Sequence, residues 1–319
     1  MKEIDFENII QSEKDFLVKM ESKLPVYSMF RDFEKHQLIV SVLQKVILIQ
    51  ENINVNNGEL IPLNAYLRYV LETLIQTELL IKEPEYKFKL FYSVYNHQVS
   101  KSIKFLERLN KEIKLMKEYE KVDNGLLKSI VIKGIEEGKD PKEVKQLHKE
   151  KVEELDDKSD LEFTIFTGDY KNNGYSFSAY LMETQLVPKY KARINQVEKL
   201  RTDKAKELVV DSRLTKHFDF KRQHTKVFKL LSDDRSWKIK AETVSLEDEY
   251  NLVYDITSSI LHSTSYSLIT NSQPVGDEIG LAKELIYKYS KKILQNCIKL
   301  SDSNIYEKFI VLNVAEEEE

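Results

Sequence analysis

The chain has 319 residues, is 41% hydrophobic and 32% charged, and contains only 8 glycines and 6 prolines. Sandwiches, barrels and glycine-rich nucleotide-binding folds need many tight turns, so this composition argues against all three. The single cysteine, Cys297, excludes an internal disulfide and a cysteine-based zinc site within one chain, and the net charge of −4 gives no global sign of nucleic-acid binding.

Apolar residues recur at helical spacing through most of the sequence, which predicts an all-α protein built as a multi-helix bundle. One segment, 161–178, departs from this pattern: it alternates polar and apolar side chains and contains "KNNG", which predicts a short hairpin or an irregular stretch. In chain order, we expect helices at 3–23, 27–53, 62–82, 85–120, 124–138, 141–157, 178–208, 222–232, 245–268, 276–298 and 302–313.

The charge pattern suggests how the chain is organised. We expect residues 1–100 to form the first part of a helical core, 101–160 a charged helical insert that projects from it, 161–314 the second part of the core, and 315–319 an acidic tail. The Lys/Glu pattern of 101–160 suits a helical hairpin that packs on another chain. Homo-oligomerisation through this insert is therefore one expected role.

The most apolar run, "LIVSVLQKVILIQ", has 13 residues and includes Gln44 and Lys45. A helix that spans a bilayer needs about 20 apolar residues, so we interpret this run as a buried core helix. No secretory signal is visible at the start of the chain. We therefore expect a cytoplasmic protein without a membrane partner.

Positive charge is concentrated in residues 189–240, which carry 16 Lys and Arg against 7 Asp and Glu. Such a stretch can bind RNA or an acidic protein partner, and Arg213 and Arg222 are its candidate binding residues. The alternative is structural, because the same stretch can face the acidic residues between Glu136 and Glu162.

The stretch "RDFEKH", Arg31 to His36, matches the arginine-to-histidine spacing used by some helical ribonucleases of the HEPN superfamily. In that chemistry, His36 would handle a proton of the 2′-hydroxyl group while Arg31 steadies the phosphate charge. The alternative is that this stretch is a solvated helix start.

The helix expected over 62–82 carries two charges at the edge of its apolar face. Arg68 and Glu72 lie one turn apart, with the arginine first, which is the weaker order for a simple surface pair. We interpret them as a partly buried pair that meets a further group, or as a structural ion pair.

The stretch "YDITSSILHSTSYSL", residues 254–268, predicts a helix with a polar inner side. A helix turns by 100° per residue, so Asp255, Ser258 and His262 fall along one stripe. Asp255 and His262 are about 10 Å apart on this helix and cannot form a catalytic dyad. We expect His262 to point into a polar pocket between helices, next to an apolar stripe that includes Leu252. The alternative is a core histidine that fixes helix packing.

These segments together resemble the uncharacterised bacterial family called domain of unknown function 5677. The resemblance covers about 30–100 and 175–270, while 101–160 has no counterpart and Ser263 stands where the family has glycine. It implies an all-helical fold with a polar cluster where the Arg/Glu helix meets the His helix, but no established activity. Some members look like cargo of mobile defence islands, which implies an antiviral or toxin-like role. The matching positions are Arg68, Glu72, Trp237, Tyr250, Tyr254, Ser258 and His262.

Three functions compete on this basis. The first is a defence effector that acts on RNA, as a ribonuclease-like hydrolase or phosphotransferase without metal or cofactor. The second is a non-catalytic binding module for a small anionic ligand or nucleotide, and the third is a protein-interaction protein. Trp237 would wall the pocket in each case. The candidate catalytic residues are His262, Arg68, Glu72, Ser258 and Tyr254, with Arg31 and His36 as the alternative pair.

Overall fold

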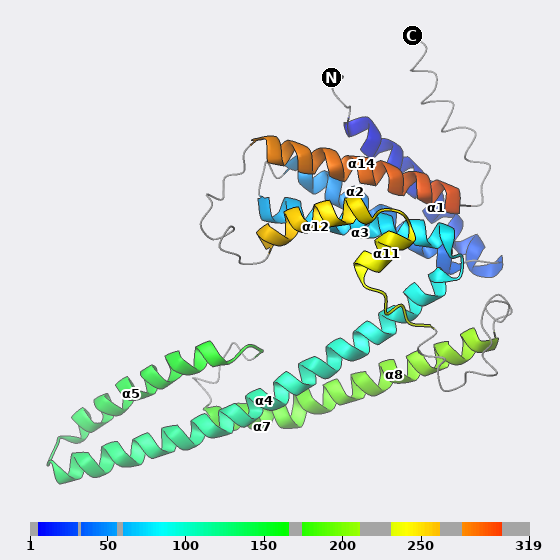
Figure 1. Cartoon of the computed structure of the whole chain (residues 1–319). Coiled ribbons are helices and arrows are strands. Elements are labelled where there is room, and N and C mark those ends of the chain that lie inside the picture. The colour runs from blue at the N-terminus through cyan, green and yellow to red at the C-terminus, as the bar shows by residue number, and fades with distance from the viewer. Residues whose placement is uncertain are drawn as a thin grey trace, which may run out of the picture. The chain divides into compact units, whose positions relative to one another are not determined.

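The computed structural model describes residues 6–30, 33–55, 60–165, 174–210, 231–261 and 276–301. All regular secondary structure in these ranges is helical, which confirms the all-α prediction (Figure 1). The helices are α1 (Phe6–Phe30), α2 (Phe33–Val55), α3 (Leu60–Lys82), α4 (Tyr86–Glu136), α5 (Pro141–Glu162), α7 (Tyr175–Leu181), the π-helix η1 (Met182–Leu186), α8 (Val187–Val210), α11 (Trp237–Thr243), α12 (Glu247–Leu261) and α14 (Gly276–Leu300).

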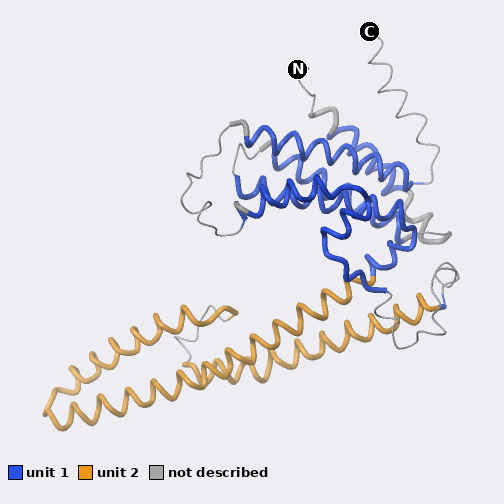
Figure 2. Tube along the Cα trace, in the orientation of Figure 1, with its two compact units in different colours: residues 1–91, 210–319 blue, residues 92–209 orange. Residues whose placement is uncertain are grey.

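The chain forms two compact units (Figure 2). The first unit combines residues 1–91 with 210–319, and the second unit comprises residues 92–209. The sequence led us to expect residues 161–314 in the second part of the core, but 161–209 belong to the second unit. Tyr175, Ala179 and Met182 explain this difference, because they pack into one apolar cluster with Leu109 and Met116 of α4.

Helix α3 lies at the centre of the first unit and packs against α14 and α12. Its apolar residues recur every three or four positions, so Leu67, Leu71 and Leu74 are almost completely buried. Helices α1 and α2 add Phe16 and Leu43 to the same core. Cys297 is fully buried there, so it acts as a small apolar side chain.

An ionic network joins the end of α3 to the segment that precedes α11. Arg235 donates to Glu83 at 2.8 Å and to Asp233 at 2.8 Å, and Lys240 lies 3.2 Å from Asp233. Ser236 then caps α11, because its hydroxyl accepts the backbone N–H of Ile239. This network fixes α11 beside α3 although the two lie far apart in the sequence.

In the second unit, α4 and α5 are joined by a short turn. Asp140 caps α5 by accepting the backbone N–H of Lys142 at 2.7 Å, and Pro141 occupies the first helical position. After α5, the fully buried Glu112 of α4 accepts the backbone N–H groups of Thr164 and Ile165. These bonds hold the bend at residues 164–165 against α4.

Several boundaries differ from the sequence prediction. Helix α4 runs without a break where two helices were expected, and Gly125 continues the helix instead of forming a turn. Residues 175–178, expected in the irregular segment, begin α7, and α11 was not predicted. The expected hairpin residues 166–173 and the expected helix at 302–313 lie outside the described ranges, as does most of 222–232.

Within the described ranges, the chain has no helix that is both long enough and apolar enough to cross a membrane.

Candidate functional site

Three of the predicted site residues meet where α12 packs on α3. Arg68 Nε donates to Glu72 Oε1 at 3.1 Å, and the Arg68 guanidinium lies 5.2 Å from the centre of the Tyr254 ring. Tyr250, one turn earlier on α12, stacks on Tyr254 with 5.7 Å between ring centres. We call Arg68, Glu72, Tyr250 and Tyr254 the Arg68 cluster. Helical spacing explains it, since each pair is four residues apart on its own helix.

The Arg68 cluster is electrically balanced and partly exposed. The side chains of Arg68 and Glu72 are 30% and 22% exposed, so the two charges compensate each other near the surface. Burial raises the pKa of Tyr250, and Glu72 adds to this effect while Arg68 opposes it. Tyr254 already has a guanidinium and a second ring as partners. The cluster therefore offers neither a free cation nor an unoccupied stacking platform for a nucleobase.

Asp255, the first residue of the polar stripe predicted on α12, is exposed, which corrects its expected place on an inner side of the helix. Asp255 and Leu252 are exposed, whereas Val253 and Thr257 form the buried side of the helix. Thr257 satisfies its hydroxyl by donating to the carbonyl oxygen of Val253 at 2.7 Å. Asp255 follows Val253 by two residues, which is about 200° around a helix, so both cannot face the core. Ser258 is partly buried at the edge of the interface.

Several predicted site residues lie outside the described residues. These are His262, Arg31, Arg213 and Arg222, so the roles proposed for them stay predictions. His36 lies in the first turns of α2 and is 1% exposed. Because His36 is buried, the alternative interpretation of "RDFEKH" as a solvated helix start is wrong for this residue.

Trp237 has a different setting from the one expected. It is the first residue of α11, it packs partly buried against the core of the first unit, and the Lys240 ammonium lies 4.9 Å from its ring centre. Trp237 is also not among the described residues that line the cavity between α3, α12 and α14. Trp237 therefore supports the position of α11, and a role as a pocket wall has no support.

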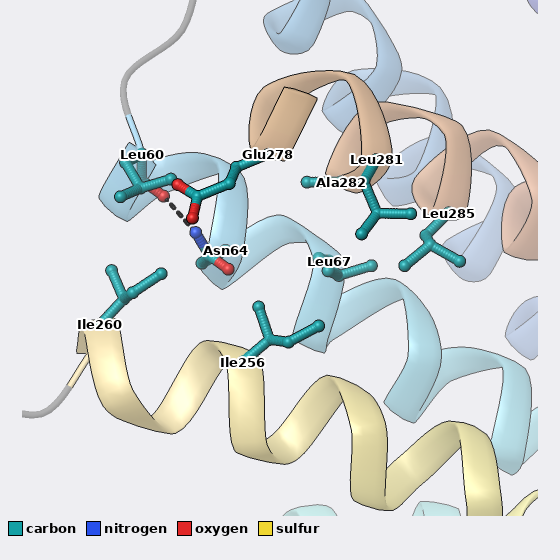
Figure 3. Close-up of a pocket in the computed structure, with 9 residues that line it drawn as sticks. All are labelled: Leu60, Asn64, Leu67, Ile256, Ile260, Glu278, Leu281, Ala282 and Leu285. Atoms are coloured by element: carbon teal, nitrogen blue, oxygen red, sulfur yellow. Dashed lines mark hydrogen bonds between the residues drawn. The ribbon is translucent and has the colours of Figure 1, made fainter. Parts of the chain in front are cut away.

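A cavity of about 270 Å³ lies between α3, α12 and α14 in the first unit (Figure 3). This cavity was not predicted from the sequence. Most of its lining is aliphatic, and the two polar side chains come from α3 and α14. The lining residues are Leu60, Asn64, Leu67, Ile256, Ile260, Glu278, Leu281, Ala282 and Leu285.

Asn64 is the unusual residue of this cavity. Its side chain is 1% exposed, and its Nδ2 donates to the carbonyl oxygen of Leu60 at 2.8 Å. That carbonyl can only accept, so the amide nitrogen must face it and the amide oxygen must face away. Asn64 Oδ1 is buried and has no hydrogen-bond partner in the described part of the chain, and Figure 3 shows it on the side of the amide away from Glu278 and the Leu60 carbonyl. Buried polar atoms are nearly always paired, so this oxygen points to a missing partner.

Glu278 supplies the second polar group. It is exposed on the first turn of α14, and Figure 3 shows its carboxylate directed toward Leu60 and Asn64. The lining described for the cavity includes no Lys, Arg or His. One weak signal in the sequence pointed here: Asn64 is a polar residue on the apolar side of α3, one turn before Arg68.

Comparisons with known proteins give no family, because no family model, curated protein or solved structure matches the chain. The resemblance to domain of unknown function 5677 therefore stays a prediction. In the ranges that the structure describes, no three His, Cys, Asp or Glu side chains gather in a way that would hold a metal ion.

Proposed function

We propose that the first unit is a binding module that holds a small molecule in the cavity between α3, α12 and α14. One observation carries this proposal. Asn64, whose buried amide oxygen has no partner among the described residues, lines a cavity whose other described walls are aliphatic apart from Glu278. A residue that only packs at this position would be Leu or Met. A polar group that accepts a hydrogen bond from a ligand accounts for asparagine.

The size and lining of the cavity support a binding role. Small-molecule sites are usually apolar hollows of about 300 to 1,000 Å³ with a few placed polar groups, and this cavity of about 270 Å³ lies just below that range. The described residues of its lining include no Ser, Cys, Lys or His that would serve as a nucleophile. Binding without chemistry is therefore the function that these residues favour.

The candidate functional site is therefore this cavity and not the Arg/Glu/His pocket that was expected from the sequence. Arg68 is engaged by Glu72 and Tyr254, so the Arg68 cluster has the features of a packing device. An effector that acts on RNA would depend on His262 or on Arg31 with His36. That hypothesis stays a prediction, and loss of RNA cleavage in His262→Ala at an unchanged melting temperature would support it.

A screen of small amphiphilic compounds by thermal shift on the full chain tests the proposal. Leu281 is half exposed and lines the cavity, so Leu281→Trp should occupy its mouth without disturbing the core. Leu252→Trp is the control, because Leu252 is equally exposed on α12 but does not belong to the lining described.

We expect compounds that raise the melting temperature of the wild type and of Leu252→Trp but not of Leu281→Trp. A screen without hits would contradict the proposal. So would hits that Leu281→Trp leaves unchanged, because they bind elsewhere.

A further inference from the structure

In the described part of the chain, a glutamate of α1 meets a glutamine of α2 at two places. At the exposed place, Gln44 Nε2 donates to Glu21 Oε1 at 2.8 Å. At the buried place, Gln50 Nε2 donates to Glu13 Oε1 at 3.3 Å, and both side chains are 0% exposed. Water can complete the hydrogen bonding of the exposed pair, whereas the buried pair depends on its own atoms.

The buried pair leaves two oxygen atoms, Glu13 Oε2 and Gln50 Oε1, without a hydrogen-bond partner among the described residues. An ionised carboxylate only accepts hydrogen bonds, so it cannot satisfy the amide oxygen. A neutral carboxylic acid has one O–H group, which can donate to Gln50 Oε1 while Gln50 Nε2 donates to Glu13 Oε1. A single proton on Glu13 therefore satisfies both unpaired atoms and adds a second hydrogen bond between α1 and α2.

The surroundings of Glu13 also favour its neutral form. Its sequence neighbour Lys14 pairs at 2.6 Å with Glu51, the neighbour of Gln50, at a more exposed position. Burial raises the pKa of Glu13 to about 7, the bond from Gln50 opposes the shift, and no charged side chain of the described chain contributes to it. From α14, the group that interacts with Glu13 is the buried Cys297 thiol, whose pKa is raised by burial and further by the glutamate charge.

Helix α1 depends mainly on one neighbour for its position. Among the described helices it packs broadly against α2 alone, whereas α2 also packs against α3 and α14. Its buried side consists of Ile10, Phe16 and Met20 with Glu13 in the middle, at a spacing of three or four residues. A charge on Glu13 therefore acts at the centre of the one broad interface that holds α1.

We propose that α1 is a pH-sensitive switch, which is held on α2 while Glu13 is protonated and opens more readily once Glu13 can ionise. The docked helix binds the proton more tightly than the released helix, in which the pKa of Glu13 returns to its ordinary 4.5. Docking is therefore most favourable below pH 4.5, weakens as pH rises to about 7, and changes little above that. The switch is separate from the proposed ligand cavity, whose described lining includes no residue of α1.

Opening of α1 uncovers an apolar surface and gives access to the only thiol of the chain. Leu43 and Val46 precede Gln50 by seven and four residues, so they share its side of α2, and both are buried. Cys297 is buried on α14 and interacts with the charge of Glu13, so it lies near the buried pair. The reactivity of this thiol therefore reports the opening without an added label.

Hydrogen exchange of the full chain, measured by mass spectrometry between pH 5 and pH 7, tests the proposal. After correction for intrinsic exchange rates, the protection of amides 13–20 should fall about 40-fold over this interval, because only the docked helix keeps the proton. At each pH, amides 13–20 should exchange faster than amides of α3 and respond more weakly to low urea, since a local opening exposes less surface.

Three variants identify the group that is responsible. In Glu13→Gln, the new amide can pair with Gln50 at every pH, so the protection of α1 should not change with pH. Glu21→Gln at the exposed contact and Glu284→Gln on an exposed side of α14 each remove one negative charge and should keep the wild-type pH dependence. At pH 8, a thiol reagent should modify Cys297 at least about tenfold faster in the wild type and in both controls than in Glu13→Gln.

Several results would overturn the proposal. Protection of α1 that stays constant with pH in the wild type, or a pH dependence that Glu13→Gln retains, would show that Glu13 does not control docking. Equal protection and equal urea response of α1 and α3 would show that α1 opens only when the whole unit unfolds. A Cys297 thiol that reacts equally fast in the wild type and in Glu13→Gln would also contradict it.

Discussion

At the scale of single residues, Glu13 shows how burial changes chemistry. It lies completely buried on α1, and its Oε1 accepts a hydrogen bond from Gln50 of α2 at 3.3 Å. Burial raises the pKa of Glu13 to about 7, although the bond from Gln50 opposes the shift. Glu13 Oε2 and Gln50 Oε1 have no hydrogen-bond partner among the described residues. We expect the neutral acid to pair with the amide through two hydrogen bonds, so that one proton satisfies both atoms.

This pair predicts that the first unit loses stability as pH rises. The folded-state pKa lies above the ordinary value of 4.5, so the folded protein binds the proton more tightly. The contribution of Glu13 is therefore most favourable below pH 4.5, declines up to about pH 7, and above that costs about 3 kcal/mol. Glu13→Gln should raise stability at pH 8 and change little at pH 4 in urea unfolding. An unchanged pH profile, equal to that of Glu284→Gln, would contradict the prediction.

The Arg68 cluster gives a second prediction at this scale. Arg68 pairs with Glu72 and lies over the Tyr254 ring, both partly exposed, so Arg68→Ala should cost about 1 kcal/mol of unfolding free energy. A double-mutant cycle of Arg68→Ala with Tyr254→Ala should give a coupling of about 0.5 to 1 kcal/mol. Coupling near zero would mean that the guanidinium and the ring do not interact in solution.

At the scale of helices, periodicity predicted the elements that bury one clear face. Helix α3 is the best example, since its leucines repeat every three or four residues and its expected start was within two residues of Leu60. The short helix α11 was not predicted, because its position depends on the contacts of Arg235 with Glu83, 152 residues away. The predicted orientation of α12 was wrong for a related reason. Thr257 can be buried because its hydroxyl donates to a carbonyl oxygen of its own helix, and the polarity of the residue alone does not show this.

The packing of α4 against α5 can be tested with two glycines of one helix. A Cβ atom at Gly134 would lie 2.4 Å from Cγ2 of Val144, whereas a Cβ atom at Gly125 would meet nothing within 4 Å. Gly125→Ala should therefore stabilise the protein by up to about 1 kcal/mol through helix propensity. Gly134→Ala should lose that gain or destabilise, and Val144→Ala in the same chain should restore it. Equal thermal shifts for the two single variants would show that the helices do not approach closely at this point.

At the scale of the whole chain, the composition was sufficient to predict an all-α protein, since few Gly and Pro leave little room for tight turns. Spacing and resemblance also predicted that Arg68, Glu72 and Tyr254 meet, because each is fixed by its own helix. The cavity could not be predicted in the same way. Its walls come from 60–67, 256–260 and 278–285, and only the packing of three distant helices brings Asn64 and Glu278 to one space.

Distant segments also explain an acid-sensitive contribution to stability. Burial opposes ionisation of Asp233, but hydrogen bonds from Arg235 and the charge of Lys240 prevail and lower its pKa to about 2. Its folded-state pKa lies below the ordinary 3.8, so its contribution is present above about pH 4 and is lost as pH falls to about 2. Asp233→Asn should cost about 1 to 2 kcal/mol at pH 6 and almost nothing at pH 2 in urea unfolding. An equal cost at both pH values would show that the charge of Asp233 is not involved.

The central claim is that the cavity of the first unit binds a small molecule, and methyl NMR of the full chain with labelled isoleucines tests it most directly. We predict that a compound that raises the melting temperature in the thermal-shift screen also shifts the signals of Ile256 and Ile260, which line the cavity, and leaves those of the exposed Ile132 and Ile135 in place. The shifts should disappear in Leu281→Trp and persist in Leu252→Trp. If no compound of the screen moves the signals of Ile256 and Ile260, or if Leu281→Trp leaves the shifts intact, the binding module is contradicted.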